Sequence, residues 1–359
     1  MSRLAVLIGA ASLLTFSAHA VDVKADAGAP TLAVTMTNDP VSNAVQVYDA
    51  ATRTLIQTLS TEGRGGAGGN ARGIRQHNGE LVAAVNNGSD SVAVYRRHQD
   101  GLKFEKLVAT SSAPVSIDFG NGHMYVAGAT TVDSFVFNGN SVGWLDGTTS
   151  LQLAAGGPPP DGSTAQIAVL DDRRVLVTLK TDPDPGTVDV VALDRGAVSG
   201  AIPIAVSAPA GTLTPFGFSV HPDGTAVITL AHSNQDGLFR NGAFTAVIPA
   251  GQAAPCWTTR VGKYVFTANT GSRTISRLVA TGNNIFVDAL VAANITAGGS
   301  PSDIDADHGV LGVIDRGAGQ AHLSLFTYNV FGELAASGTP ITLGAPNANG
   351  VAIVPPAER

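Results

Sequence analysis

Four residues in this chain have side chains suited to chemistry on a small acidic molecule. Arg72 offers a planar fork of donors, which suits a carboxylate or the polarised carbonyl of a lactone. Asp303 becomes a general base if it loses contact with water, and His232 is a candidate proton carrier. Cys256 is a candidate nucleophile with His232 as its base, because cysteine chemistry needs a thiolate and a nearby proton acceptor. We take Arg72, His232 and Asp303 as the candidate catalytic residues.

Each of these residues also has a purely structural interpretation, which the sequence leaves open. Arg72 suits an ion pair or hydrogen bonds with a neighbouring structural unit, for instance with Asp303. Asp303 equally suits a turn, where its carboxylate caps backbone N–H groups. Cys256 is equally a small buried hydrophobe, and Trp257 beside it is either a stacking wall for a ligand or packing.

Several other chemistries lack support in the sequence. There is no His-x-His motif and no Glu-rich cluster, and the whole chain contains only five Glu, so we expect no metal site and no cofactor. No Gly-x-Ser-x-Gly elbow is present for a serine hydrolase. The net charge is −7 and no cluster of Lys and Arg exceeds two neighbours, which argues against a nucleic-acid partner.

The elements that must position these residues repeat seven times along the chain. Each unit opens with a short strand-like segment, and successive segments begin 43, 50, 51, 40, 46 and 47 residues apart. A polar hairpin turn and a second apolar strand follow in each complete unit. Repeats of roughly 40–50 residues built from short strands indicate the blades of a β-propeller. The opening segments begin at Ala71, Pro114, Thr164, Pro215, Pro255, Pro301 and Ala348.

The two ends of the chain predict how the ring closes. Thr31–Met36 matches a second strand and Ala44–Tyr48 matches a third strand, so the first blade lacks its opening strand. Asn349–Val354 has the pattern of an opening strand with no blade after it. We therefore predict an all-β, seven-bladed propeller that forms a single domain over residues 21–359. Its C-terminal strand completes the first blade and removes the exposed sheet edges.

This architecture predicts where the candidate residues meet. The opening strands of a propeller line the central channel, and their starts share one face with the loops between second and third strands. We expect the binding site on that face, formed by Asn70, Asn87, Cys256, Trp257, Asn269 and Asn349. Four histidines at the opposite, hairpin end are interpreted as turn or surface residues: His77, His123, His221 and His308. Gly63–Gly69 is interpreted as a flexible connection.

The first twenty residues predict a secretion signal. Arg3 supplies a positive start, Leu4–Phe16 forms an apolar run, and Ala18-His19-Ala20 fits a cleavage site. We expect residues 1–20 to be removed, so that the mature chain begins at Val21 and is periplasmic or secreted. An uncleaved membrane anchor is the alternative, although the apolar run is short for a transmembrane helix. No later stretch predicts a membrane span.

Four motifs resemble those of a known family: Thr214-Pro215-Phe216-Gly217-Phe218, Pro255-Cys256-Trp257, Tyr264–Ser272 and Pro301-Ser302-Asp303. They look like the secreted branch of the seven-bladed propeller lactonase family, which includes 6-phosphogluconolactonases and 3-carboxy-cis,cis-muconate lactonizing enzymes. The resemblance covers nearly the whole mature chain. It implies metal-independent opening or formation of lactone rings on acidic substrates, with Arg, His and Glu around the channel mouth. Arg72 and His232 correspond to the first two of these residue types.

Two functions follow as expectations. In the first, the protein is a secreted lactonase-like enzyme that acts on a lactone or acidic small molecule at the channel mouth. In the second, it is a non-catalytic propeller scaffold that binds a glycan, a small ligand or another exported protein. The fold by itself does not choose between them. In both cases we expect a monomer whose partner is a small molecule or a glycan.

Overall fold

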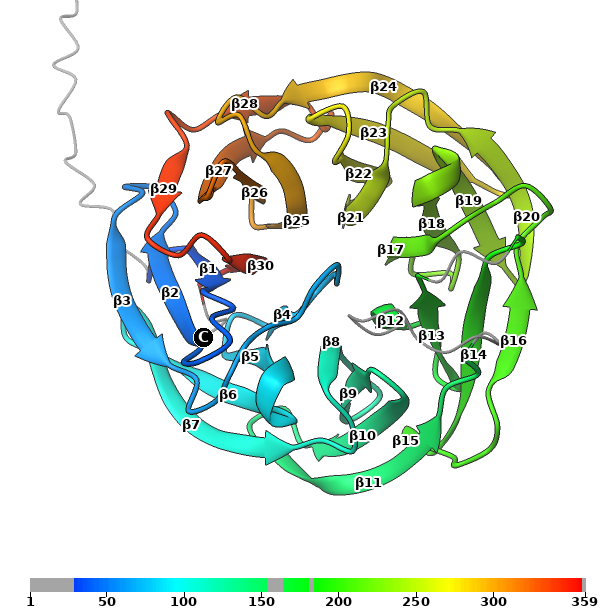
Figure 1. Ribbon diagram of the computed structural model, residues 1–359, viewed down its shortest axis with the longest axis horizontal. Helices are drawn as coiled ribbons and strands as arrows, with labels where there is room; N and C mark the ends of the chain where they lie inside the picture. Colours follow the sequence, from blue (N-terminus) through cyan, green and yellow to red (C-terminus); the bar gives the residue numbers. More distant parts are fainter. Residues whose placement is uncertain (1–28, 154–163, 181–183, 357–359) are drawn as a thin grey trace, which may run out of the picture.

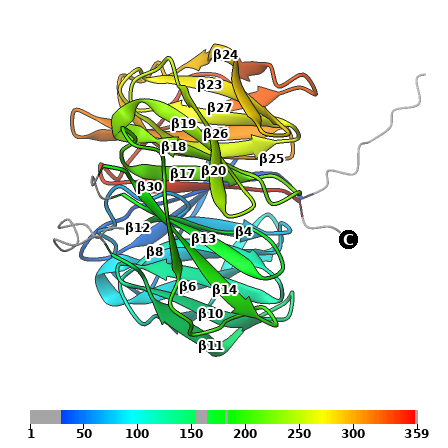
Figure 2. The ribbon, with the colours of Figure 1, turned by 90° about the vertical axis from the view of Figure 1, so that its right-hand side faces the viewer.

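The computed structural model describes residues 29–153, 164–180 and 184–356, so the expected signal peptide lies outside the described residues. These residues form seven antiparallel sheets arranged as blades around a central channel (Figure 1). The predicted all-β, seven-bladed propeller is therefore confirmed. Seen from the side, the strands run across the thickness of the ring (Figure 2). The only helices in the described part are two single 3-10 turns, η1 (Asn87–Ser89) and η2 (Ala231–Ser233), and no helix there is long and apolar enough to cross a bilayer.

The strands fall into four concentric positions. The inner strands are β30 (Asn349–Val354), β4 (Ile74–His77), β8 (Pro114–Gly120), β12 (Thr164–Val169), β17 (Pro215–Val220), β21 (Pro255–Val261) and β25 (Ser300–Asp307), in blades 1 to 7 respectively. The second strands are β1 (Leu32–Met36), β5 (Leu81–Asn86), β9 (His123–Gly128), β13 (Arg174–Leu179), β18 (Ala226–Leu230), β22 (Tyr264–Asn269) and β26 (Val310–Gly317). In the first blade, β1 agrees closely with the predicted second strand Thr31–Met36.

The third and outer strands complete each sheet. The third strands are β2 (Ala44–Asp49), β6 (Ser91–His98), β10 (Thr131–Phe137), β14 (Thr187–Asp194), β19 (Gln235–Arg240), β23 (Thr274–Thr281) and β27 (Gln320–Tyr328). The outer strands are β3 (Leu55–Ser60), β7 (Gly101–Ala109), β11 (Val142–Ser150), β20 (Ala243–Pro249) and β24 (Asn284–Asn294). In blades 4 and 7 the outer position is shared by β15 (Ala197–Val198) with β16 (Ile204–Ser207), and by β28 (Leu334–Ala336) with β29 (Ile341–Leu343).

Burial explains the different sequence patterns of these positions. Second strands such as β5 and β9 are buried at every residue, because both of their faces pack against neighbouring blades. The outer strand β3 has no buried residue, since it forms the rim of the ring. The core therefore lies between blades, and one apolar cluster joins Val34 of β1, Val82 of β5 and Ile117 of β8.

The two ends of the chain close the ring in the first blade. Strand β30 pairs with β1, with Leu32 opposite Val354 and Val34 opposite Ala352. Figure 1 shows the red C-terminal strand beside the blue N-terminal one. All six residues of β30 are buried, so this strand is part of the core and not an appendage. The predicted closure by the C-terminal strand is thus confirmed.

Polar side chains connect the inner strands of neighbouring blades. These strands belong to separate sheets, so their buried N–H and C=O groups need partners other than a sheet ladder. Gln166 of β12 donates to the Phe218 carbonyl at 2.7 Å and accepts from the Phe218 N–H at 2.9 Å. Asp118 of β8 accepts from the Val169 N–H at 2.9 Å. Such contacts hold the channel wall in one arrangement.

The chain before β4 crosses one end of the channel. Lys180 of blade 4 donates its ammonium group to the carbonyls of Gly68 at 2.7 Å and Gly69 at 3.1 Å. The Ala71 N–H bonds the Ala165 carbonyl, also in blade 4, at 3.0 Å. We call residues 68–71 the channel plug, and Figure 1 shows the chain before β4 reaching the centre of the ring.

Asn70 fixes the channel plug to three further blades. Its carbonyl accepts from the Trp257 indole N–H of blade 6 at 2.9 Å. Its side chain donates to the Val115 carbonyl of blade 3 at 2.8 Å and accepts from Asn349 of blade 1 at 2.5 Å. The preceding Gly65 packs so closely that an added Cβ would lie 2.4 Å from the Asn38 carbonyl carbon. The glycine-rich segment is therefore a fixed part of the wall and not the flexible connection that the sequence predicts.

Candidate functional site

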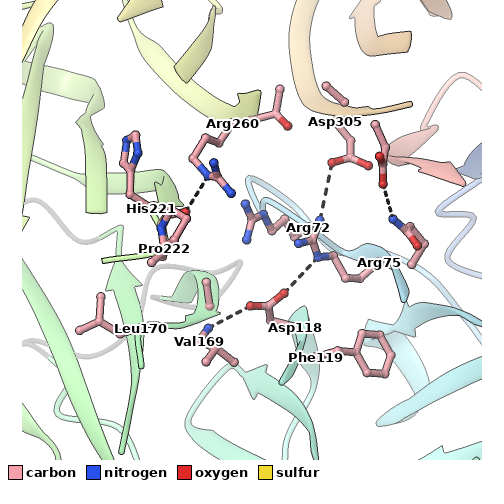
Figure 3. Close-up of a pocket in the computed structure, with 16 residues that line it drawn as sticks. Arg72, Arg75, Asp118, Phe119, Val169, Leu170, His221, Pro222, Arg260 and Asp305 are labelled. Carbon is pink, nitrogen blue, oxygen red and sulfur yellow. Dashed lines mark hydrogen bonds and ion pairs between the residues drawn. The ribbon is translucent and has the colours of Figure 1, made fainter. Parts of the chain in front are cut away.

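The channel contains a cavity of about 390 Å³ at the end opposite the plug. Most of its lining comes from the last residues of the inner strands and from the hairpins that follow them (Figure 3). The charged and polar residues of the lining are Arg72, Arg75, Gln76, Asp118, His221, Thr259, Arg260, Asp305 and Asp307. We call the two channel ends the plugged end and the hairpin end. We expected the site at the plugged end, whereas this charged cavity lies in the other half of the channel.

Arg72 enters this cavity from the plugged end. It follows the plug directly and has a φ of 56°, while its carbonyl accepts from the Ile117 N–H at 3.0 Å. Its guanidinium group makes no hydrogen bond or ion pair with any residue that the structure describes. Burial, and secondly the charge of Arg75, lower the pKa of Arg72 to about 10, so the side chain remains a cation at neutral pH.

The charge of Arg75, in contrast, is matched by carboxylates. Its Nε lies 3.0 Å from the Asp118 carboxylate and its Nη1 lies 3.6 Å from Asp305. The second oxygen of each carboxylate is also used, because Asp118 accepts from Val169 N–H and Asp305 from Ile353 N–H. Arg75 and its two carboxylates therefore hold three blades together, and the charge of Arg75 is fully matched within this group.

Arg260 provides a second guanidinium group without a carboxylate partner. Its Nε donates to the Val220 carbonyl at 3.0 Å and its Nη1 to the Gly262 carbonyl at 2.7 Å. Burial lowers its pKa, with no acid beside it to raise it again. In Figure 3 the guanidinium groups of Arg72 and Arg260 point toward the same part of the cavity. Neither guanidinium group forms an ion pair with a described carboxylate, although Asp118, Asp305 and Asp303 raise the pKa of Arg72 through space. Two guanidinium groups that face one cavity without an ion-pair partner make this part of it suited to an oxyanion.

His221 lines the same cavity and provides a titratable group. Its backbone N–H closes the hairpin by bonding the Thr225 carbonyl at 2.7 Å, which agrees with the predicted turn role. Its ring also reaches the cavity wall, where Nε2 is buried and has no hydrogen-bond partner. Burial, and then the charge of Arg260, lower the pKa of His221 below 6.5. The imidazole is therefore neutral at pH 7 and able to accept a proton.

The structure brings several predicted site residues together, but they lie at the plug and do not line the arginine-lined cavity. Asn70, Trp257 and Asn349 form the contacts that hold the plug, and all three are buried. Asp303 lies nearby, fully buried, and accepts from the backbone N–H groups of Val351 and Ile304 at 3.1 and 3.0 Å. Burial raises the pKa of Asp303 to about 7. These contacts favour the structural interpretation of all four residues.

The remaining predicted residues lie outside the cavity. Burial raises the pKa of the Cys256 thiol to about 11, so the group is protonated at neutral pH, as expected of a buried hydrophobe. His232 is exposed in η2. Asn87 bonds the Pro114 carbonyl at 3.1 Å, and the buried Asn269 bonds hydroxyls of its own blade. Among the catalytic candidates, Arg72 is the one that lines the cavity.

Sequence reasoning missed Arg75, Arg260 and His221. A usable signal is the alternation of charged residues along an inner strand, as in Asp303, Asp305 and Asp307 of β25, because alternate residues of a strand face the same side. Such charges at channel-facing positions mark a polar channel. Within the described ranges, no group of three or more His, Cys, Asp or Glu side chains lies close enough to hold a metal ion.

Fold and cavity together define a seven-bladed β-propeller with an arginine-lined site in its channel. No protein-family model and no curated protein sequence matches the chain. Among solved structures, it is similar to a candidate 6-phosphogluconolactonase from Bacteroides uniformis, with a TM-score of 0.64 and 16% identity over 90% of this chain and 99% of that one. A second candidate 6-phosphogluconolactonase, from Bacteroides fragilis, gives a TM-score of 0.62 and 13% identity over 90% and 98%.

The likeness extends to a propeller of different activity. A catalytically inactive virginiamycin B lyase from Staphylococcus aureus gives a TM-score of 0.53 and 16% identity over 75% of this chain and 84% of that one. At such identities the comparisons establish the fold alone. They confirm that the predicted resemblance to lactonase-type propellers holds at the level of architecture, while the chemistry has to be argued from the cavity.

Proposed function

We propose that this protein binds a small acidic lactone, or the corresponding ring-opened acid, in the channel cavity and interconverts the two. The observation that supports this proposal best is the pair Arg72 and Arg260, two partly buried guanidinium groups that form no ion pair with a carboxylate and face one cavity. A volume of about 390 Å³ is in the range of small-molecule sites. The fold shared with candidate 6-phosphogluconolactonases agrees with lactone chemistry.

Arg72, Arg260 and His221 each have a role in ring opening under this proposal. One guanidinium group holds the acidic substituent, and the other stabilises the negative charge that develops on the carbonyl oxygen. Neutral His221 takes a proton from water as the water oxygen attacks the carbonyl carbon. The ring C–O bond then breaks, the ring oxygen receives that proton from the imidazolium, and the new carboxylic acid ionises. In this mechanism His221 replaces His232 and Asp303 as the proton carrier, because it lies in the cavity.

Acid release in a pH-stat from a panel of γ- and δ-lactones, with and without a carboxylate or phosphate substituent, tests the proposal. We expect Arg72→Gln and Arg260→Gln to lower turnover of the acidic lactones by at least about tenfold each. Arg316→Gln is the matched control, since Arg316 lies outside this cavity. Turnover should also fall as the pH drops through the lowered pKa of His221, below 6.5, and this limb should vanish in His221→Gln.

The outcomes separate catalysis from binding. No acid release with saturable binding of the ring-opened acid, lost in Arg72→Gln, would refute the reaction and leave a binding propeller. The absence of both acid release and binding would refute the ligand site as well as the reaction.

Export is a separate part of the proposal and is supported by the sequence of residues 1–20, which lie outside the described residues. Expression in a Gram-negative host, fractionation and intact-mass measurement test it. A mature chain that begins at Val21 in the periplasm or medium is the expected result. A full-length chain in the cytoplasmic fraction would contradict it.

A further inference from the structure

A second cavity, of about 370 Å³, lies at the plugged end, between blades 6 and 7. Its polar lining comes from Thr270, Ser300, Ser302, Arg316 and Gln320, and Trp257 forms part of its wall. Trp257 is also the residue whose indole N–H bonds the Asn70 carbonyl of the plug at 2.9 Å. The plug therefore separates this cavity from the arginine-lined cavity at the hairpin end, with which it shares no lining residue.

Arg316 is the charged group of the second cavity. It lies near the end of β26, opposite Ser300 of β25, and is half-buried. Its guanidinium group makes no hydrogen bond or ion pair with any residue that the structure describes. The adjacent Asp315 does not compensate it, because that fully buried carboxylate lies 3.2 Å from the His322 ring. A partly desolvated cation without a neighbouring acid favours an anion in the cavity.

The groups around Arg316 are neutral and suited to hydroxyl groups. The side chains of Ser300 and Gln320 make no hydrogen bond to a described residue, and both residues line the cavity. Thr270 and Ser302 instead bond the carbonyls of Pro301 and Ile314. The wall thus offers one cation, one amide and one hydroxyl, next to an aromatic ring. A hydroxylated molecule with a single acidic group matches this set.

We infer that the cavity around Arg316 is a second ligand site, which takes a monosaccharide-sized molecule bearing one oxyanion, either a carboxylate or a phosphate. Its volume is in the range of small-ligand sites. The guanidinium group binds the oxyanion through its fork of donors, while Ser300 and Gln320 bind hydroxyl groups. This site does not depend on lactone chemistry in the channel.

The two tryptophans of the chain provide a direct readout. Trp144 is 70% exposed on β11 of blade 3, far along the ring, whereas Trp257 forms a wall of the proposed site. In a Trp144→Phe background the indole emission reports Trp257 alone. We would titrate the full-length protein with glucuronate, glucose 6-phosphate and glucose at constant ionic strength. Isothermal titration calorimetry under the same conditions detects binding that leaves the emission unchanged.

We expect saturable binding of at least one of the two acidic sugars and none of glucose at the same concentrations. The comparison of glucuronate with glucose 6-phosphate shows which oxyanion the site prefers. Arg316→Gln should weaken this binding by at least about tenfold, and Arg72→Gln should leave it unchanged. Because Arg316 has no described partner, its loss should not impair folding, which a thermal melt verifies.

Two results would overturn the inference. One is the absence of saturable binding of both acidic sugars by emission and by calorimetry. The other is binding that persists in Arg316→Gln or disappears in Arg72→Gln, which would place the ligand elsewhere or in the channel. Failure of the channel proposal has a different signature, since lactone turnover would then be absent while binding at Arg316 remains.

Discussion

The carboxyl group of Asp236 in blade 5 leads to a sharp prediction about stability. Its side chain is fully buried on β19, and neither oxygen accepts a hydrogen bond. Burial raises its pKa from 3.8 to about 7. The folded protein therefore holds a proton that the unfolded chain has already released over this pH range. The raised pKa has no effect on stability below about pH 4. As the pH rises from about 4 to about 7, the carboxyl group ionises in the unfolded chain but not in the folded protein, which lowers the free energy of unfolding.

The size of the effect follows from the change in pKa. A pKa difference of one corresponds to a free energy of about 1.4 kcal/mol, so the change from 3.8 to about 7 lowers the free energy of unfolding by about 4 kcal/mol. In Asp236→Asn this dependence disappears, because an amide does not titrate. At pH 4 the amide and the protonated acid both bury an unpaired polar group, so the two proteins should be about equally stable. Above pH 7 the variant should be more stable by about 4 kcal/mol.

Urea unfolding followed by circular dichroism at pH 4.5 and pH 7.5 measures this difference. Asp194→Asn is the matched control, since the side chain of Asp194 is 70% exposed, and its difference from the wild type should be near zero at both values. Other buried acids affect wild type and variant equally, so they cancel in the comparison. A constant stability difference between wild type and Asp236→Asn across this range would refute the assumption that the buried carboxyl group is protonated.

Three further predictions concern the channel and the closure of the ring. Arg260→Gln should weaken binding of an acidic ligand in the channel by about tenfold or more in calorimetry, while the urea midpoint shifts little; equal loss of both would contradict a ligand role. A chain that ends at Ala348 lacks β30 and should lose its cooperative thermal transition, because six buried residues of the first blade are missing. Lys180→Met should raise amide hydrogen exchange in residues 68–71 by about tenfold, since it removes two hydrogen bonds that hold the plug. Unchanged protection would show that the contacts of Asn70 and Ala71 are sufficient to hold it.

The blades and their closure were predictable from the sequence because their causes are local. A strand buried on both faces must be a short apolar run, and a hairpin turn needs residues that tolerate a positive φ. Both signals recur in every unit, so the strands could be counted and their ranges placed. The first unit, which begins near Thr31, lacks an opening strand, and the chain has one extra opening strand at Asn349. The prediction that the extra strand completes the first unit is confirmed by the pairing of β30 with β1 in blade 1.

The end of the channel that holds the arginine-lined cavity was not predictable from the sequence. Contacts between residues far apart in the chain determine which end the plug closes. The plug is held by hydrogen bonds from Lys180, Trp257 and Asn349, which lie 112, 187 and 279 residues from their plug partners. The local sequence pattern of Gly63–Gly69 gives no indication of these contacts. The same holds for charge. Arg72 and Arg75 look equivalent in the sequence, and only the approach of Asp118 and Asp305 from other blades neutralises Arg75. The sequence by itself thus determined the ring, whereas tertiary structure decided which cations stay unpaired, because pairing depends on distances in space.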